Sequence, residues 1–479
     1  MKTPRLPRLQ FRRNLLALTL ALSCAPLLAA ELKPRVIVLT DLKRTHETDD
    51  SQSLVRLLAW ADLVEIEAIV VSSGMNYWEP RHAIDGYAYG FELLDAYRRD
   101  LPNFLKLTGQ RGFDPVEAAQ AIGYWPSADY LVRRYVLGTP LQGFDKVGLG
   151  KDNEGSRLLT AIVDESDERP IYVLVWGGPN VLAQALWDMT ENPAMRRVPE
   201  AVEAFVKKLR VIAIGDQDVP WNRRRNPDQA NNSSHWLRTR FAGMHWVWIS
   251  GSGFVSTSRD RQPFYQAHIQ GHGALGNAYP DHTNGIEGDT PSLLHVLPLG
   301  GGDPEHPEWG TLAGIYPRQP GEPQHAVVYR NRAPETPDGE HSPSGLGAAV
   351  APAMWNLLAA RLDWARSGTG NRPPQLVVEG DAGWRPLHRT VPAGGTVRID
   401  ASQTHDAEMD KFTFRWEVLT LQDTRSEGVV LSDSAAPVVD VRVPADAVGA
   451  TVHLLLTVTD DGGGHPLSAW RRVVLNVSP

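Results

Sequence analysis

The chain has 479 residues, of which 42% are hydrophobic, and its 48 basic and 56 acidic residues give a formal net charge of −8. A usual domain has roughly 100–200 residues, so one large domain with a smaller one is expected. The mild negative charge, with no basic stripe in the body of the sequence, argues against nucleic acid as a partner.

The first 30 residues have the pattern of a secretory signal peptide. Five Lys or Arg residues precede an apolar run that starts at Leu15, and the small residues Ala29 and Ala30 end it. The run is too short to favour the alternative, a membrane anchor. The sole cysteine, Cys24, lies in this segment, so the processed chain has no thiol for a disulfide, a nucleophile or a zinc site. We therefore expect export to the periplasm or the extracellular space, by either the general or the twin-arginine route.

Residues 35–366 alternate short apolar runs with longer helical patterns. The runs that read as strands buried on both faces are RVIVLT, EIEAIVVSS, PIYVLVWG, LRVIAIG and MHWVWISG. Helical spacing is found in SQSLVRLLAWA, HAIDGYAYGFELLDAYRR and NVLAQALWDMT. This alternation predicts an α/β domain whose mostly parallel sheet is flanked by helices.

A break rich in Gly and Pro follows, and residues 367–374 are expected to be a linker. From residue 375 to 479, short alternating runs such as TVRIDAS, KFTFRWEVL and VHLLLTVTDDG are separated by turn residues, with one central tryptophan at Trp416. The pattern predicts a C-terminal β-sandwich of the immunoglobulin-like type.

Acidic residues gather where the first predicted strand ends. Asp41 closes the strand, and Glu47, Asp49 and Asp50 follow before a helical pattern begins. Ligands of open parallel sheets bind at the carboxyl ends of the strands, and clustered carboxylates resist ionisation together unless a cation joins them. Ca²⁺, a hard cation that takes several oxygen ligands, is the economical explanation. A compatible alternative is that Asp49 and Asp50 cap the helix and that Glu47 is solvated.

This stretch resembles the N-terminal signature of the nucleoside hydrolase superfamily, Asp-x-Asp-x-x-x-Asp-Asp. More closely, the chain resembles the secreted nucleoside-hydrolase-like family described as cellulose-binding, which has its own C-terminal β domain. The closer resemblance covers nearly the whole chain after the signal peptide and rests on TDDSQSLVRLL, YVLVWGGPNVLAQAL, GDQDVPW and EGDTPSLLHVLPLGGGDPEHPEWG. It implies a site whose carboxylates hold Ca²⁺ and activate water against an N-glycosidic carbon.

The resemblance assigns roles to the first acidic cluster. Asp41 matches the first Asp of the signature, and Asp49 and Asp50 match its closing pair, with Asp50 as a bidentate metal ligand. Two extra residues separate Asp41 from that pair. The second signature Asp, usually the general base, has no direct counterpart. The nearest acid is Glu47, so Asp41 and Glu47 are the catalytic candidates on this side.

Two later segments complete the implied metal site. The backbone carbonyl of Trp176 matches a carbonyl ligand, and Asp289 matches the last carboxylate ligand. The superfamily's leaving-group acid is a His directly before that Asp, but this chain has Gly288 there. A positioned acid is worth about 10²–10⁴-fold in rate, so its loss matters. Glu287 is the first candidate to replace it, with His282 and His272 as alternatives.

Polar and aromatic residues follow two other predicted strands. Asn76 matches an Asn that binds sugar hydroxyls in the superfamily. Asp216, Gln217, Asp218 and Trp221 end another strand, and such a set suits a sugar because polar groups bond hydroxyls while an indole covers an apolar face.

Three functions are compatible with these patterns. The first is an exported, Ca²⁺-organised carbohydrate-active protein that binds, or also cleaves, a plant-type glycan related to cellulose. The second is a Ca²⁺-dependent N-ribosyl (nucleoside) hydrolase. The third is a non-catalytic structural or binding module whose acids only cap a helix. Export and an appended β domain favour the glycan over nucleoside salvage, by analogy alone.

Overall fold

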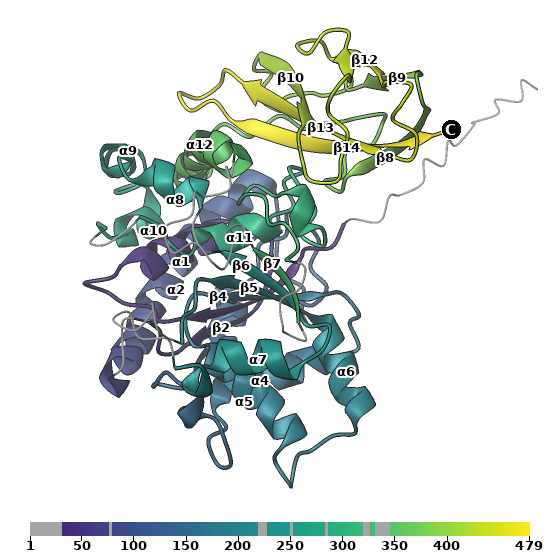
Figure 1. The fold of residues 1–479 in the computed structure, drawn as a ribbon. Coiled ribbons are helices and arrows are strands. Elements are labelled where there is room, and N and C mark those ends of the chain that lie inside the picture. The colour runs from purple at the N-terminus through teal and green to yellow at the C-terminus, as the bar shows by residue number, and fades with distance from the viewer. Residues whose placement is uncertain are drawn as a thin grey trace, which may run out of the picture.

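The computed structural model describes residues 31–75, 79–218, 228–249, 252–282, 286–319, 326–330 and 345–479 (Figure 1). The predicted signal peptide lies outside the described residues. The helices are α1 (Asp49–Ala59), α2 (Pro80–Thr108), α3 (Ala128–Arg133), α4 (Glu154–Val163), α5 (Pro179–Thr190), α6 (Pro199–Lys208), α7 (Ser233–Arg240), α8 (Gly253–Ser258), α9 (Gln262–His268), α10 (Gly273–Ala278), α11 (Thr290–Val296) and α12 (Gly345–Ser367). The strands are β1 (Arg35–Thr40), β2 (Glu65–Val71), β3 (Tyr135–Leu137), β4 (Ile171–Val175), β5 (Leu209–Ile214), β6 (His245–Ile249), β7 (Val327–Arg330), β8 (Leu387–Pro392), β9 (Thr396–Asp400), β10 (Phe412–Leu419), β11 (Val430–Leu431), β12 (Val438–Arg442), β13 (Thr451–Asp460) and β14 (Ser468–Ser478).

Within the described residues, the first seven strands form one sheet in the order β3-β2-β1-β4-β5-β6-β7. Every neighbouring pair in it is parallel. The strand order reverses at β1, which pairs with β2 on one side and with β4 on the other. Ligand sites in such sheets lie at this reversal, beyond the carboxyl ends of the strands. The predicted α/β fold with a mostly parallel sheet is confirmed.

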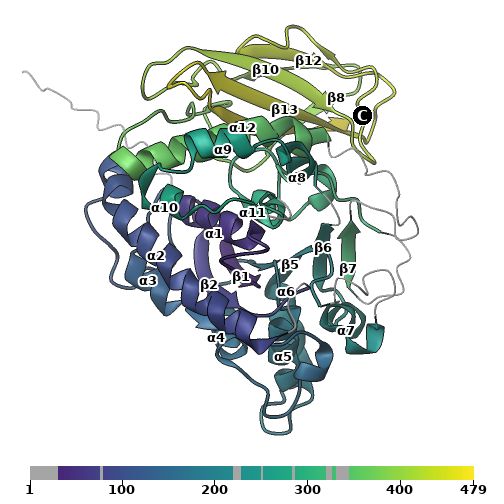
Figure 2. The same cartoon turned by 90° about the vertical axis from the view of Figure 1, so that its left-hand side faces the viewer.

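Both faces of the sheet are covered by helices (Figure 2), which suits strands that are mostly apolar. Val36 and Val38 of β1 belong to the core shared with α1, α2 and α12, whereas Ile37 and Leu39 belong to the core shared with α4 and α5. Figure 2 shows α1, α2 and α12 on one side of the sheet and α4 and α5 on the other. Alternate residues of β1 therefore pack against different helices, and α1 lies on the side of Val36 and Val38. Helix α1 carries Asp49 and Asp50, two residues of the acidic cluster.

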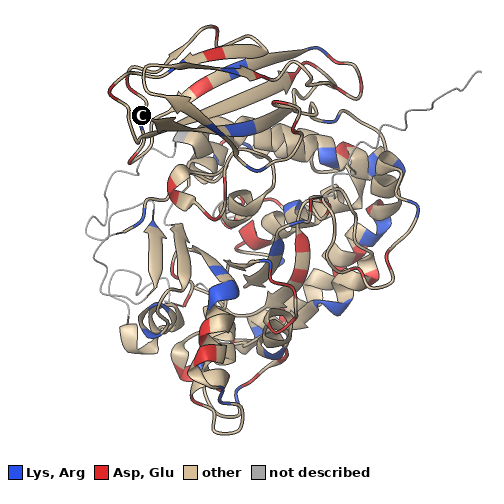
Figure 3. Cartoon of the chain, turned by 90° about the vertical axis from the view of Figure 1, so that its right-hand side faces the viewer, with Lys and Arg blue, Asp and Glu red and all other residues tan. Residues whose placement is uncertain are grey.

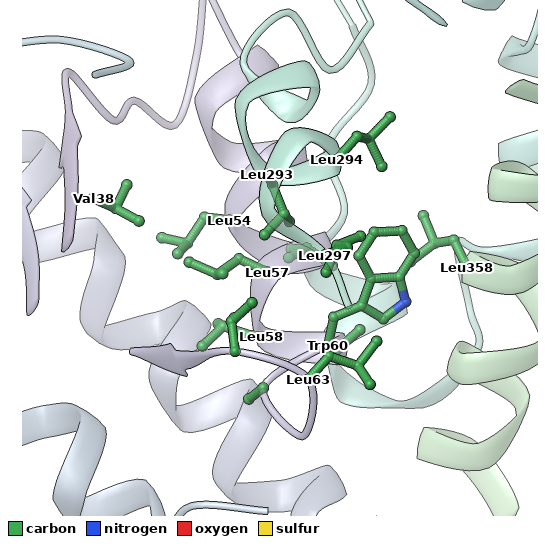
Figure 4. Close-up of a cluster of buried hydrophobic side chains, with 14 of the residues drawn as sticks. Val38, Leu54, Leu57, Leu58, Trp60, Leu63, Leu293, Leu294, Leu297 and Leu358 are labelled. Carbon is green, nitrogen blue, oxygen red and sulfur yellow. The ribbon is translucent and has the colours of Figure 1, made fainter. Parts of the chain in front are cut away.

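Acidic and basic residues are interspersed along the ribbon of the described residues (Figure 3), in keeping with the mild net charge. The apolar packing beneath α1 is shown in Figure 4, where Leu54 and Leu57 of α1, and Trp60 just after it, lie against Leu293 of α11 and Leu358 of α12. These side chains are fully buried. The core thus brings α1 and α11 together although they are far apart in the sequence.

The C-terminal part consists of a sheet with the order β10-β13-β14-β8 and a second sheet with the order β11-β12-β9. Trp416 is buried in the core between them. The larger sheet faces α12 (Figure 1), and Leu455 of β13 and Trp470 of β14 belong to the α/β core. Arg472 of β14 is fully buried and donates hydrogen bonds to the carbonyl oxygens of Gly301 (2.9 Å) and Gly310 (3.2 Å). The predicted C-terminal β-sandwich is confirmed.

No helix among the described residues combines the length and the apolar character that crossing a bilayer requires.

Candidate functional site

The reversal of strand order places Asp41 between two glycines. Asp41 directly follows β1, and Trp176 and Gly177 directly follow β4 and donate their backbone N–H groups to Leu39 O (2.8 and 3.0 Å). A Cβ on Gly177 would lie 3.0 Å from Asp41 Oδ1, and a Cβ on Gly74 would lie 2.2 Å from Asp41 Oδ2. Only residues without a side chain let both backbones approach the Asp41 carboxyl group this closely.

Three further carboxyl groups meet beside it. Asp49 and Asp50 occupy the first turn of α1, and Asp289 immediately precedes α11. One carboxylate oxygen from each of the three lies within 4.8 Å of the others. Asp41 and Glu47 line the same pocket as this trio. All the predicted carboxylate ligands therefore line one pocket, although Asp289 is far from the other three in the sequence.

The electrostatics of the cluster are unfavourable without a counter-charge. Burial raises the pKa of Asp49 to about 6, and burial with the neighbouring Asp49 carboxylate raises the pKa of Asp50 to about 7. Burial, followed by repulsion from Asp50, raises the pKa values of Asp41 and Asp289 well above their ordinary range. The ammonium group of Lys43 interacts with Asp41, Glu47 and Asp50, but burial lowers its own pKa to about 8. A single monovalent cation cannot neutralise five carboxyl groups.

The donor set fits a hard divalent cation. Asp289 Oδ2 is buried and has no hydrogen-bond partner, a costly state for a carboxylate oxygen unless an ion or a proton meets it. The donors are all carboxylate oxygens, the ligand type that Ca²⁺ prefers. Asp49, Asp50 and Asp289 would hold such an ion. Asp41, which lines the same pocket, remains a predicted fourth ligand. A contribution from the carbonyl of Trp176 remains a prediction.

The pocket in front of the cluster has a volume of about 250 Å³. Its lining has an acidic part, formed by the cluster, and an apolar part to which Met75, Ile214, Ile249 and Val255 contribute. Such a cavity is small, below the roughly 300–1,000 Å³ of sites for drug-sized ligands. One wall that accepts hydrogen bonds and one that is apolar suit a single sugar ring.

Gly288 lies against the cluster, which explains why this position has no side chain. A Cβ there would lie 2.4 Å from Asp49 Oδ2, far inside a van der Waals contact. The Asp49 carboxylate thus occupies the space that a side chain at position 288 would need. No imidazole can enter at this position without moving Asp49.

Glu287, the predicted replacement acid, is not at the pocket. Its carboxylate is fully buried in an ion pair with Arg56 and accepts hydrogen bonds from Tyr279 Oη (2.7 Å) and Thr290 Oγ1 (2.8 Å). It is therefore committed to holding α1 and the start of α11 together. This corrects the expectation of a catalytic role for Glu287.

The alternative histidines are also engaged away from the pocket. His272 Nδ1 lies 2.7 Å from Asp363 Oδ1, and His282 Nδ1 lies 3.0 Å from Tyr265 Oη. Neither is among the residues that line the pocket. Among the described lining residues, the acids of the cluster and Glu47 are the titratable groups.

The acids after β5 divide into different roles. Asp218 is buried and accepts hydrogen bonds from the backbone N–H groups of Gly143 (2.6 Å) and Ser233 (2.7 Å), so it anchors loops and is not free to bind a sugar. Asp216 Oδ2 accepts a hydrogen bond from Asn232 Nδ2 (2.7 Å) and does not line the pocket. Gln217 does line it. The predicted sugar-binding residues Asn76 and Trp221 lie outside the described residues.

The apolar wall was not anticipated from the sequence. Ile249 ends β6, Ile214 ends β5, and Met75 lies shortly after β2. Their common signal is position, because each lies at or just beyond the carboxyl end of a parallel strand. Apolar residues at these points read as ordinary strand ends, so nothing in their chemistry marked them.

Comparison with known proteins agrees with this fold. The family described as cellulose-binding Sde182, nucleoside hydrolase-like domain, matches residues 35–316. The family described as cellulose-binding protein Sde0182, C-terminal domain, matches residues 396–477. No curated protein sequence matches the chain significantly.

One solved structure gives the same picture. The chain is similar to a nucleoside hydrolase-related hypothetical protein from Saccharophagus degradans that is associated with carbohydrate metabolism. The two are 31% identical with a TM-score of 0.76, and the match covers 93% of this chain and 100% of the other. Titin domain M3 is 14% identical over 23% of this chain and 100% of the domain, with a TM-score of 0.15.

The fold and the carboxylates at the strand reversal define a nucleoside-hydrolase-like α/β protein with an attached β domain. The chain belongs to the cellulose-binding Sde182 family with a nucleoside hydrolase-like domain, as its sequence motifs implied.

Proposed function

We propose that this protein is an exported saccharide-binding protein whose carboxylate cluster holds Ca²⁺ and thereby organises a sugar pocket. The observation that carries the proposal is the meeting of the Asp49, Asp50 and Asp289 carboxylates around the unpartnered Asp289 Oδ2. Bound Ca²⁺ would supply positive charge and open coordination positions for sugar hydroxyl groups. The protein's own contribution is to hold the carboxylates in place and to provide the apolar part of the pocket lining.

Three observations support a saccharide as the ligand. The pocket combines a hydrogen-bonding wall with an apolar wall, as a sugar ring requires. The matching families are described as cellulose-binding. The similar protein from Saccharophagus degradans is described as associated with carbohydrate metabolism. The N-terminal signal pattern supports export, where such glycans are met.

The pocket chemistry disfavours the alternative of a nucleoside hydrolase. A leaving base must be protonated, but Gly288 stands in the place of the acid and Glu287 is held by Arg56. Losing a positioned acid costs about 10²–10⁴-fold in rate. Glu47, which lines the pocket, remains the candidate base for any glycosidic hydrolysis.

Calorimetry on protein freed of divalent ions by EDTA tests the proposal. We expect Ca²⁺ to bind at one site, cellotetraose to bind more weakly when Ca²⁺ is absent, and inosine and uridine to be hydrolysed negligibly. Failure of Ca²⁺ to bind would overturn the metal assignment. Rapid inosine hydrolysis that Asp50→Ala abolishes would overturn the binding role and establish the nucleosidase.

A further inference from the structure

A second cavity lies between α12 and the outer face of the larger C-terminal sheet. Its volume is about 530 Å³, and it shares no lining residue with the acidic pocket. Figure 2 shows α12 running along the sheet beneath β10 and β13. Cavities of this size between two packed parts of a chain are frequent ligand sites. We call this cavity the interdomain groove.

Strand register builds the sheet wall of the interdomain groove. Thr413 pairs with Thr459, which pairs with Ser468, and Arg415 pairs with Thr457, which pairs with Trp470. All of them line the groove, while the alternating residue Trp416 points into the sandwich core. Leu419 and Leu455 line the groove from the same face of these strands. This wall is thus mixed, with the hydroxyl groups of Thr413, Thr457, Thr459 and Ser468 beside leucine side chains.

The helix wall is apolar and built from small residues. Leu346, Ala349, Val350 and Ala353 of α12 line the groove. Because two of the four are alanines, the helix leaves space that a larger side chain would fill. The indole of Trp309 also lines the groove.

The groove has a closed end and an open end. Leu455 and Trp470 are 2% and 5% exposed and pack into the α/β core. Thr413, Arg415 and Ala349 are exposed, and β10 is the edge strand of its sheet. An extended ligand can therefore enter along β10 and end against Trp470.

The charges favour a neutral ligand. Arg415 forms an ion pair with Glu417 at the groove, where the Arg415 side chain is exposed and the Glu417 side chain is partly exposed. The pair adds hydrogen-bonding groups without net charge, so it offers no preference for an anion or a cation. A flat chain with apolar faces and hydroxyl groups along its edges matches a groove that offers the apolar residues of α12 on one side and hydroxyl groups interspersed with leucines on the other.

We propose that the interdomain groove binds a β-linked glucan chain, with its apolar face on α12 and its hydroxyl groups on the Thr457 side. This rests on the proposed saccharide-binding function and adds a site for the chain that is separate from the acidic pocket. The groove and the pocket would then act on different portions of a glycan.

The test measures cellotetraose binding by calorimetry in Ca²⁺-containing buffer. Ala349→Trp places an indole in the groove from an exposed position of α12. The matched control is Ala161→Trp, which adds the same side chain at an exposed position of α4, away from the groove. Thr457→Val removes a hydroxyl group without changing the volume. We expect Ala349→Trp to weaken binding at least tenfold, Thr457→Val to weaken it severalfold, and Ala161→Trp to leave it unchanged. Circular dichroism and thermal midpoints verify folding of each variant.

Further outcomes of these measurements distinguish saccharide binding in the interdomain groove from saccharide binding in the acidic pocket. Unchanged binding by both groove variants, with binding lost in Asp50→Asn, would place the saccharide in the acidic pocket and overturn the groove alone. No binding by the unmodified protein would overturn both. Equal affinity for maltotetraose, whose α-linkages curve the chain, would overturn the assignment of a flat β-linked ligand.

Discussion

Arg56 and Glu287 form a two-pronged, fully buried ion pair that joins α1 to the segment just before α11. Arg56 Nε contacts Glu287 Oε2, and Arg56 Nη2 donates to Glu287 Oε1 (2.9 Å). Glu287 also has a left-handed backbone, with φ of 50°, which a residue with a side chain rarely adopts. The pair therefore fixes the chain two residues before Asp289, so Glu287 supports the carboxylate cluster without facing the pocket.

Breaking this pair should be costly. We expect Glu287→Leu to lower the free energy of unfolding by about 3–5 kcal/mol, because it leaves the Arg56 guanidinium buried without its counter-charge. The double variant Arg56→Met with Glu287→Leu should recover much of that loss. Urea unfolding measures both. A single variant as stable as the unmodified protein would refute the structural role assigned to Glu287.

Gly288→Ala should disturb the metal cluster. The added Cβ would meet the Asp49 carboxylate, so Asp49 must move, and we expect Ca²⁺ affinity to fall by about tenfold, or ~1.4 kcal/mol. Gly112→Ala is the control, because a Cβ there meets nothing within 4 Å. Calorimetric Ca²⁺ titration of both variants decides, and an unchanged affinity in Gly288→Ala would show that the contact is not limiting.

Asp50→Asn should affect the Ca²⁺-bound and Ca²⁺-free protein in opposite directions. Removing one charge should weaken Ca²⁺ binding at least tenfold, yet the Ca²⁺-free variant should unfold at a higher temperature because repulsion among buried carboxylates is relieved. The exposed Asp85→Asn on α2 should change neither property. Loss of stability in Ca²⁺-free Asp50→Asn would indicate that the cluster is stabilised by means other than a cation.

Buried His295 predicts a defined pH dependence of stability. It is 1% exposed, and burial lowers its pKa to about 3. Below pH 6.5 the unfolded chain takes up a proton that the folded chain refuses, so stability falls as the pH decreases. The loss from this residue between pH 7.5 and pH 5 should be about 2 kcal/mol.

The comparison with His295→Gln isolates this effect. Buried carboxylates with raised pKa values change stability in the opposite direction, so the informative quantity is the difference between the two proteins. Urea unfolding in EDTA at pH 7.5, 6.5 and 5 should show a flatter profile for the variant. Parallel profiles would contradict the assignment.

The central strands of the α/β sheet could be predicted because β1, β2, β4, β5 and β6 are apolar runs buried on both faces. The edge strands β3 (three residues) and β7 (four residues) were missed. Segments this short carry too few residues for a periodic pattern, and pairing with β2 and β6 defines them.

Prediction of the site divides in the same way. The meeting of the Asp residues at one place could be anticipated because ligands of parallel sheets bind beyond the carboxyl ends of the strands. Their role as Ca²⁺ ligands stays a prediction. Glu287 was assigned a catalytic role, but its partner is the buried Arg56. Asp218 was assigned to ligand binding, but it accepts hydrogen bonds from the N–H groups of Gly143 and Ser233. In both cases the partner is distant in the sequence and comes close only on folding. From the sequence alone, an acidic residue beside a motif cannot be assigned either to a pocket or to an ion pair with a buried arginine.

The burial of Arg472 has a consequence for how this protein can evolve. Its guanidinium, whose pKa burial lowers to about 10, relies on carbonyl oxygens of Gly301 and Gly310 in the α/β part. If recombination joined the C-terminal part to an unrelated protein, the Arg472 guanidinium would lose its carbonyl acceptors. A buried cation without partners is destabilising, so we expect selection to act against such a chimera. Unlike freely shuffled accessory modules, these two parts should be inherited as a pair, and substitutions at position 472 should track those in the loop containing Gly301 and Gly310.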